Sequence, residues 1–196
     1  MVPYEFTDPY TGVVYLVGSV SELDAVAIAD WEYDPPYTMY NLRGSLLAIV
    51  EFLTGPYYSV RRDGRLVGFF CYGHAARVKH RHSERYYRDT AYLDIGLGLH
   101  PQACGQGYGL GFLTCGLAFA KAHFGVSRFR LTAVSTNYRA LKVYTRAGFR
   151  EIGRFERQGL SEPMEFVVMT LDLDQVPGAA GPLSEAPPDY SGPGRP

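Results

Sequence analysis

A run of closely spaced glycines lies between a strand-like segment and a helix-like segment, and it limits the possible folds more than any other feature. The run reads LHPQACGQGYGLG from Leu99 to Gly111, with glycines at 105, 107, 109 and 111. Glycine lets the backbone of such a turn approach a ligand and adopt φ values closed to other residues. The first turn of the following helix has unpaired N–H groups and the positive end of the helix dipole. Together these features predict a backbone site for a phosphate or diphosphate.

Two familiar phosphate-binding loops do not fit this run. A Walker loop needs Gly-Lys-Ser/Thr after its second glycine, but Gly109 is followed by Leu110 and Gly111, and the next lysine is Lys121. A dinucleotide fingerprint needs GxGxxG, but its third glycine would fall on Leu110 or on Phe112. The run is therefore neither a P-loop nor a Rossmann fingerprint.

Strand and helix signals alternate around the glycine run. The expected boundaries of the strands and helices follow from three signals: the spacing of apolar residues, the helix-cap positions Ser21 and Asn137, and the Asp63-Gly64 turn. The expected strands are 13–17, 57–62, 65–72, 92–99, 129–134, 149–154 and 164–173; the expected helices are 21–31, 46–53, 109–124 and 137–147. The order β-α-α-β-β-β-α-β-α-β-β predicts a mixed α/β domain, of the α+β kind with a mixed sheet.

The chain is expected to form one domain over residues 1–174, followed by a disordered tail. Residues 175–196 contain ten Pro or Gly among 22 residues and few large apolar groups, so they cannot bury enough surface to fold.

Composition and charge exclude several classes of protein. The net charge of -1 argues against a nucleic-acid binder held by a global basic field. No apolar run approaches the roughly 20 residues needed to span a bilayer, and the N-terminus lacks the features of a signal peptide. Three cysteines without CxxC spacing cannot form a disulfide framework or a zinc ribbon. We therefore expect a cytoplasmic protein without a membrane or nucleic-acid partner.

Two motifs resemble the GNAT superfamily of N-acetyltransferases. Gln102-x-x-Gly105-x-Gly107 is similar to its Gln/Arg-x-x-Gly-x-Gly/Ala signature, and it follows a strand that ends Leu-His-Pro. The segment Asn137–Phe149 is similar to its second signature, Asn-x-x-Ala-x-x-x-Tyr-x-x-x-Gly-Phe. Asp94-Ile95-Gly96 resembles the branch with Asp/Glu-Ile-Gly on that strand. The resemblance covers about residues 11–173 and implies a GNAT-like fold with splayed central strands.

The resemblance implies acetyl-CoA as co-substrate and no metal. Loop amides would hold the CoA diphosphate, and the edge of strand 92–99 would pair with the pantetheine amides, as in β-augmentation. Asn137 would contact the cofactor; alternatively it only caps its helix. The loop has Cys104 where the family often has arginine, so it carries fewer positive charges. The implied cofactor-binding residues are Leu97, Leu99, Gln102, Cys104, Gly105, Gln106, Gly107, Tyr108, Gly109 and Asn137.

The resemblance also places Tyr144 as the acid that protonates the departing thiolate, whose pKa is about 8.5. Tyr144 lies two helical turns after Asn137, so both share a face; the alternative is a core tyrosine. Asp94 is a candidate base for the amine proton; the alternative is an aspartate that orients a loop or a neighbouring side chain. Glu32 and Glu51 are further carboxylates, each better explained by a solvated helix end.

Four aromatic residues follow the first expected helix: Trp31, Tyr33, Tyr37 and Tyr40. In the family this region covers the acceptor side. Aromatic groups mixed with the acidic residues Glu32 and Asp34 suit a cationic amine. The alternative is a hydrophobic plug beneath a loop.

The segment 77–88 reads RVKHRHSERYYR, with five Lys/Arg against one Glu. It is either a patch for an acidic partner or the CoA 3′-phosphate, or a solvated hairpin loop. His80 and His82 have no evident third metal ligand.

These observations lead to three hypotheses. The first is an acetyl-CoA-dependent N-acetyltransferase in which a small-molecule or peptide amine attacks the acetyl group directly. A homodimer is a candidate assembly for this enzyme. The second is a non-catalytic acyl-CoA-binding sensor or scaffold. The third is an oligonucleotide binder through segment 77–88, which the near-zero net charge disfavours.

Overall fold

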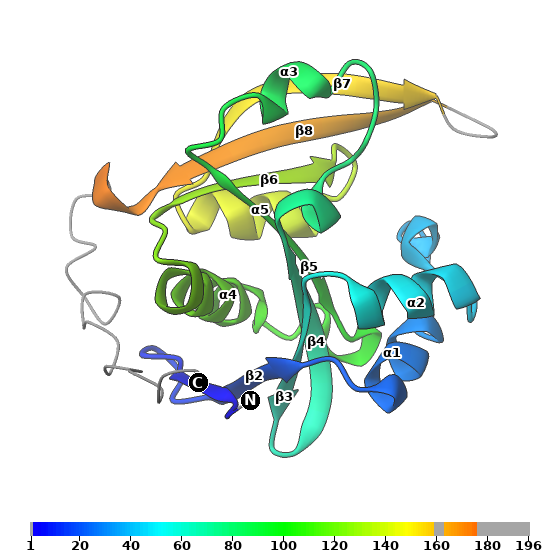
Figure 1. Cartoon of the computed structure of the whole chain (residues 1–196), viewed down its shortest axis with the longest axis vertical. Helices are drawn as coiled ribbons and strands as arrows, with labels where there is room; N and C mark the ends of the chain where they lie inside the picture. The colour runs from blue at the N-terminus through cyan, green and yellow to red at the C-terminus, as the bar shows by residue number, and fades with distance from the viewer. Residues whose placement is uncertain (1, 159–162, 176–196) are drawn as a thin grey trace, which may run out of the picture.

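The computed structural model of the chain describes residues 2–158 and 163–175, which form one eight-stranded mixed sheet with helices on both faces (Figure 1). The strand order is β1-β2-β3-β4-β5-β6-β8-β7. The strands are β1 (Tyr4–Thr7), β2 (Val14–Ser19), β3 (Tyr57–Arg62), β4 (Arg65–Tyr72), β5 (Leu93–Leu99), β6 (Arg128–Val134), β7 (Arg150–Gln158) and β8 (Pro163–Asp172). The helices are α1 (Glu22–Ala29), α2 (Leu46–Thr54), α3 (Glu84–Tyr87), α4 (Gly109–Phe124) and α5 (Tyr138–Arg146), with 3₁₀ turns η1 (Thr38–Tyr40), η2 (Gly73–Ala76), η3 (Pro101–Ala103) and η4 (Leu173–Gln175).

The predicted mixed α/β class is confirmed, and local signals explain why the boundaries agree. Ser21 and Asp24 form a reciprocal capping box at the start of α1. Asp63 and Gly64, with φ of 51° and 73°, make the turn between β3 and β4. Gly125, with φ of 68°, ends α4 in the left-handed conformation. Apart from Gln175, the predicted tail lies outside the described residues.

Two elements were absent from the sequence-based expectation. β1 is a four-residue edge strand in which Phe6 alone is buried, too short for an alternating pattern to identify. α3 is a single turn within the basic segment, which we expected to be a patch or a solvated loop. The strand expected over 149–154 also continues to Gln158.

The sheet opens at β5, which changes partner along its length. Residues 95–99 of β5 pair with β4 in antiparallel register. With β6, β5 has only two parallel pairs, Leu93 with Phe129 and Asp94 with Arg130. Beyond Asp94 the two strands diverge, which is the predicted splay of the central strands.

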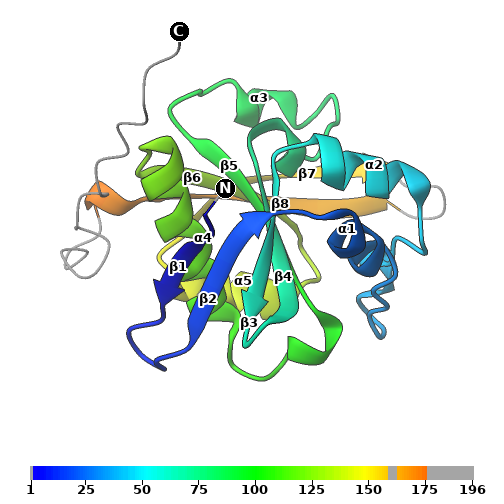
Figure 2. The same ribbon diagram turned by 60° about the horizontal axis from the view of Figure 1, so that its bottom comes forward.

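The alternation of side chains along β5 defines the two faces of the sheet. Ile95, Leu97 and Leu99 pack against the main core, which α4 and α5 cover. Gly96 and Gly98 face the other way, where an added Cβ would meet the Cys71 sulfur or the Phe69 ring. Phe69 packs on a second apolar cluster, here called the α1–α2 cluster, which contains Ala25, Ile28, Trp31 and Phe52. Tyr86 of α3 packs on a third cluster, which contains Val134, Phe155, Phe166 and Val168. In Figure 2, α2 and α3 accordingly lie on the opposite side of the β8–β7 pair from α5.

Candidate functional site

The turn between β5 and α4 has the open backbone geometry that its glycines predict. Gly105 and Gly107 have φ of 77° and 85°, values that side-chain-bearing residues rarely adopt. Gln106 Nε2 donates to the carbonyl of Gln102 at 2.6 Å, which closes the turn on itself. The Gln102 amide donates to His100 Nδ1 at 3.2 Å. The turn is therefore shaped by its own short hydrogen bonds.

The N-terminus of α4 has no side-chain cap. Tyr108 occupies the N-cap position without accepting a hydrogen bond, whereas Ser21, Ser45 and Asn137 cap α1, α2 and α5. The first N–H groups of α4 have no intrahelical acceptor, and the helix dipole is positive at this end. They can therefore bind a diphosphate, as the sequence predicts. At Gly109, an added Cβ would lie 2.9 Å from Val143 Cγ2, so glycine lets α4 begin close against α5.

Two arginines from other elements lie beside this turn and supply the charge that the loop lacks. Arg139, on α5, has a guanidinium nitrogen 3.9 Å from the position of a Cβ on Gly105. The same group lies 4.0 Å from the centre of the Tyr37 ring. Arg62, at the end of β3, stacks on Tyr108 at 4.1 Å. We did not identify either arginine from the sequence, although Arg139 lies within the second motif, two residues after Asn137.

The edge of β5 that faces the splay carries Leu97 and Leu99. On their other side these residues pair with Phe70 and Gly68 of β4. The Leu99 carbonyl already accepts a hydrogen bond from the Tyr33 hydroxyl at 3.0 Å. An amide-bearing ligand entering the splay would therefore meet an open strand edge that Tyr33 covers at one end.

Tyr144 is buried on α5 and packs on Phe149. Burial raises the pKa of its hydroxyl, and the nearby Tyr40 adds to the rise. Among the described residues, Tyr15 has the sole buried side-chain oxygen or nitrogen that lacks a hydrogen-bond partner. The Tyr144 hydroxyl forms no hydrogen bond within that part of the chain, and the ring is 8% exposed. Its proton is therefore not committed to another group of the described residues, although the ring is part of the core.

Asn137 links the start of α5 to the aromatic segment. Its side-chain oxygen accepts from the Ala140 amide at 3.2 Å, which is the predicted N-cap. Its amide nitrogen donates to the Tyr40 hydroxyl at 3.0 Å. Burial raises the pKa of Tyr40, and this hydrogen bond partly opposes the rise. Asn137, Tyr40 and Tyr144 therefore meet at one place beside the splay.

The four aromatic residues predicted for the acceptor pocket separate into two groups. Tyr33, Tyr37 and Tyr40 lie against Leu99, Arg139 and Asn137, respectively. Trp31 instead is 7% exposed, stacks edge-on against His100 and packs on Phe69 in the α1–α2 cluster. The packing of Trp31 fits the alternative of a hydrophobic plug, and its assignment to substrate binding stays a prediction.

Asp94 lies away from the glycine-rich turn, at the point where β5 and β6 separate. It is 2% exposed, and Arg130 Nε and Nη2 donate to its two carboxylate oxygens at 2.6 Å and 2.9 Å. Arg77 Nε donates a third bond at 2.7 Å. With its oxygens engaged by two guanidinium groups, Asp94 fits the alternative role of orienting its neighbours, and its role as the base stays a prediction.

Arg130 was not identified from the sequence. It is 1% exposed, and its Nη1 also donates to the carbonyls of Tyr86 and Asp89 at 2.6 Å and 3.0 Å. The signal was an arginine within the otherwise apolar strand RFRLTAV. The other two candidate carboxylates, Glu32 and Glu51, are exposed, and Glu51 accepts a hydrogen bond from Tyr57 at 2.8 Å.

Other chemistries find little support in the described part of the chain. Burial raises the pKa of the Cys104 thiol despite the opposing charge of Arg139, so Cys104 is not an activated nucleophile. Residues 2–158 and 163–175 contain no group of three His, Cys, Asp or Glu side chains able to hold a metal ion. In those residues no helix combines the length and apolarity needed to cross a membrane.

The sequence matches a family model, and the fold matches solved structures. A family model described as Acetyltransferase (GNAT) family matches residues 22–149. RimJ of Mycobacterium smegmatis, solved in complex with CoA-disulfide, is 19% identical, with a TM-score of 0.60 over 90% of this chain and 92% of that one. A GNAT-family acetyltransferase from Bacillus anthracis is 15% identical, with a TM-score of 0.61 over 88% and 98%. Ribosomal-protein-S5-alanine acetyltransferase from Vibrio fischeri is 16% identical, with a TM-score of 0.55 over 89% and 98%. No curated protein matches the sequence.

Proposed function

The chain belongs to the GNAT acetyltransferase family, and from that premise we propose that it transfers the acetyl group of acetyl-CoA to a primary amine. The acceptor amine belongs to a small molecule or a protein, and it attacks directly within a ternary complex. One observation carries the proposal: an open strand edge leads into the uncapped N-terminus of α4, and α5, which packs against that N-terminus at Gly109, carries Tyr144.

Donor binding uses the glycine-rich turn and the edge of β5. The amides from Cys104 to Gly109 hold the diphosphate, and Arg139 and Arg62 add positive charge beside it. The edge at Leu97 and Leu99 pairs with the pantetheine amides. The CoA-disulfide bound to RimJ supports a CoA-type donor for this fold.

The acyl-transfer step places different demands on the donor and acceptor sides. The neutral amine attacks the thioester carbonyl, the C–N bond forms and the C–S bond breaks. The released thiolate takes the Tyr144 proton, and Tyr144 then recovers a proton from water. Backbone N–H groups on the open side of β5 stabilise the tetrahedral oxyanion. The amine loses its proton to water, while Asp94 holds the splay through Arg130 and Arg77. Tyr33, Tyr37 and Tyr40 line the acceptor side.

Calorimetry and a thiol-release assay test this proposal in sequence. Acetyl-CoA and free CoA are expected to bind, and an amine library is expected to yield acceptors that release CoA thiol. Binding without release against every amine would favour the alternative, a non-catalytic acyl-CoA sensor or scaffold. An absence of binding at millimolar acetyl-CoA would exclude both functions.

Arg139→Ala is expected to weaken acetyl-CoA binding about tenfold, because it removes the guanidinium beside the loop that lacks its own arginine. Calorimetry measures the effect, and Arg150→Ala serves as the control because Arg150 is exposed on β7. Equal affinities for both variants would show that the loop amides bind the diphosphate without Arg139.

We also propose a homodimer through the outer face of α1 and α2. Six aliphatic side chains there are 41–84% exposed: Leu23, Val26, Leu46, Leu47, Val50 and Leu53. They present on the order of 600 Å² of apolar surface, at the upper end for a monomer and close to the roughly 800 Å² per partner of a standard interface. Sedimentation equilibrium is expected to give twice the 21.8 kDa chain mass. Leu47→Glu is expected to give the monomer, and a monomeric wild-type protein would contradict this dimer.

Cys71, Cys104 and Cys115 are free thiols. A cytoplasmic location remains a prediction.

A further inference from the structure

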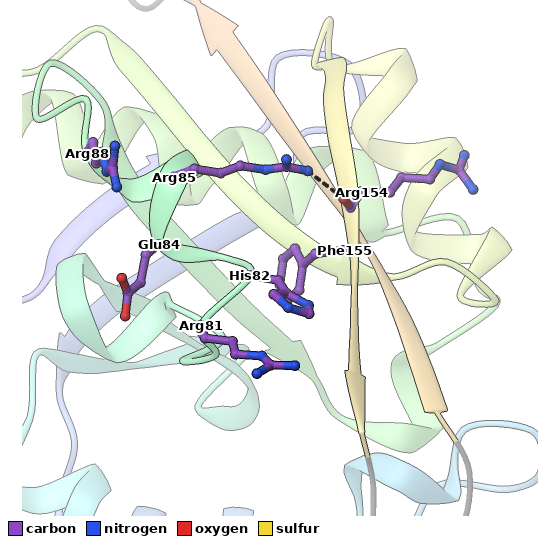
Figure 3. Close-up of a pocket in the computed structure, with 7 residues that line it drawn as sticks. All are labelled: Arg81, His82, Glu84, Arg85, Arg88, Arg154 and Phe155. Carbon is purple, nitrogen blue, oxygen red and sulfur yellow. Dashed lines mark hydrogen bonds between the residues drawn. The ribbon is translucent and has the colours of Figure 1, made fainter.

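Four cations on the segment before β5 form an exposed basic surface: Lys79, Arg81, Arg85 and Arg88. None of the four forms an ion pair with a carboxylate of the described residues. Arg85 donates to the Tyr86 hydroxyl at 2.7 Å and to the Arg154 carbonyl at 3.4 Å. Figure 3 shows Arg81 and Arg85 directed toward β7, with Glu84 and Arg88 on the other side of the segment. Their charge is thus concentrated and largely uncompensated, on a chain whose net charge is only -1.

The basic surface is hollowed rather than flat. A hollow of about 440 Å³ lies between Arg81, Arg85 and the β7 residues Arg154 and Phe155. A second hollow of about 480 Å³ contains Lys79 and Arg77, and the two share Glu84 and Arg88 as a common wall. Glu84 is the one carboxylate that lines the two hollows, and in each hollow arginine and lysine side chains outnumber it. Each hollow can therefore receive an anionic side chain.

The segment is held in place by hydrogen bonds within itself and to β6 and β7, which argues against a merely solvated loop. Ser83 is 1% exposed, and its hydroxyl donates to the Val78 carbonyl at 2.8 Å. The Tyr86 hydroxyl donates to the Arg154 carbonyl at 2.9 Å, and Arg130 binds the Tyr86 carbonyl from below. The cations therefore project from a fixed backbone, which reduces the entropy lost when a ligand binds.

The second hollow adjoins the splay of the sheet. Arg77 lines it and also binds Asp94, where β5 and β6 separate. Tyr87 lines it as well and shares a hydrogen bond of 2.8 Å with Thr132, two residues beyond the last β5–β6 pair. The α1–α2 cluster packs on the same face of the sheet. The basic surface thus flanks the face on which the acceptor side is proposed.

We propose that this surface binds acidic side chains of a peptide acceptor whose N-terminal amine enters the splay. The inference rests on the proposed function and deepens it by naming the acceptor class. Guanidinium groups bind carboxylates through paired, charge-assisted hydrogen bonds, and Arg clusters recognise acidic motifs in this way. Two hollows in series exceed the needs of a single carboxylate, and they suit acidic side chains spaced along one chain.

The first arm of the test compares acetylation of peptides that share a free N-terminal residue. Residues 3–8 of each peptide are all Glu, all Gln or all Lys, and thiol release gives kcat/KM. The Glu peptide is expected to exceed the Gln peptide at least fivefold at low salt, and the difference is expected to shrink at high salt. Arg81→Glu with Arg88→Glu is expected to abolish the preference. Arg65→Glu, exposed on the distant β3–β4 hairpin, is the matched control and is expected to retain it.

The second arm measures binding without turnover. Fluorescence anisotropy with an Nα-acetylated Glu peptide, which cannot be acetylated again, is expected to show salt-dependent binding that the double variant loses. Binding without acetylation of any peptide would overturn the acceptor role of the peptide, whereas an absence of thiol release with every peptide and every small-molecule amine would refute the proposed function itself. Acetylation with no preference among the peptides would overturn the inference alone. Tighter binding of a single-stranded oligonucleotide, competing with the Glu peptide, would also overturn it and assign the surface to nucleic acid.

Discussion

Tyr144→Phe is expected to lower kcat for acetyl transfer by about 100-fold while leaving the affinity for acetyl-CoA unchanged. The change removes the hydroxyl that the proposed mechanism uses as the proton donor, on a ring that is 8% exposed. General acid catalysis contributes roughly 10²–10⁴-fold, and a thiolate with a pKa of about 8.5 leaves comparatively well, which favours the lower end. Phenylalanine preserves the packing on Phe149, so the fold is expected to be unaffected.

The pH dependence of the wild-type rate gives a second measure of the same role. An acid must be protonated to act, and burial raises the pKa of Tyr144 above the ordinary tyrosine value. The rate is therefore expected to rise with pH as the amine loses its proton, with no fall from Tyr144 ionisation below about pH 10. Tyr138→Phe, on the same helix but 73% exposed, is the control. Unchanged turnover of the Tyr144 variant at every pH would exclude the acid role.

Asp94→Ala is expected to lower the free energy of unfolding by about 3–5 kcal/mol, because it leaves Arg130 buried without its counter-charge. Urea denaturation of the two proteins measures this difference. The double change Asp94→Leu with Arg130→Met is expected to recover much of the loss, since it removes both buried charges together.

Activity separates this positioning role from catalysis by a base. Asp94→Asn keeps one oxygen that can accept from an arginine, and circular dichroism selects conditions in which the variant is folded. If Asp94 only orients its neighbours, the variant is expected to keep the shape of the wild-type pH profile. A folded variant that loses the low-pH limb of the profile would restore Asp94 as the base.

Local signals explain which parts of the fold were predictable. Glycines with positive φ, helix caps and the Asp63-Gly64 turn act within a few residues, so the glycine-rich turn and α4 could be located from sequence. β1 and α3 have four residues each, so they are too short to show a periodic apolar pattern. Their stability comes from contacts with the rest of the fold. Such short elements carry too little pattern to recognise.

The candidate site was less predictable because its residues meet across long separations. Arg130 and Asp94 are 36 positions apart, and nothing local indicates that one neutralises the other. Trp31 lies in a segment rich in aromatic and acidic residues, which suggests binding, but its ring packs on Phe69 in a core. Tyr40 and Asn137 are separated by 97 positions, so their contact could be found only in the folded chain.

The two-pair junction between β5 and β6 has a consequence for the motions of the protein. The halves of the sheet share few backbone bonds there, so β5 amides beyond Asp94 that point toward β6 have no strand to shield them. Those amides should exchange with deuterium quickly in the empty protein, at a rate that does not require either half to unfold. A donor bound along the strand would slow the exchange of these amides and leave the exchange of the β4-facing amides unchanged. Isotope exchange would therefore show which part of β5 the donor covers.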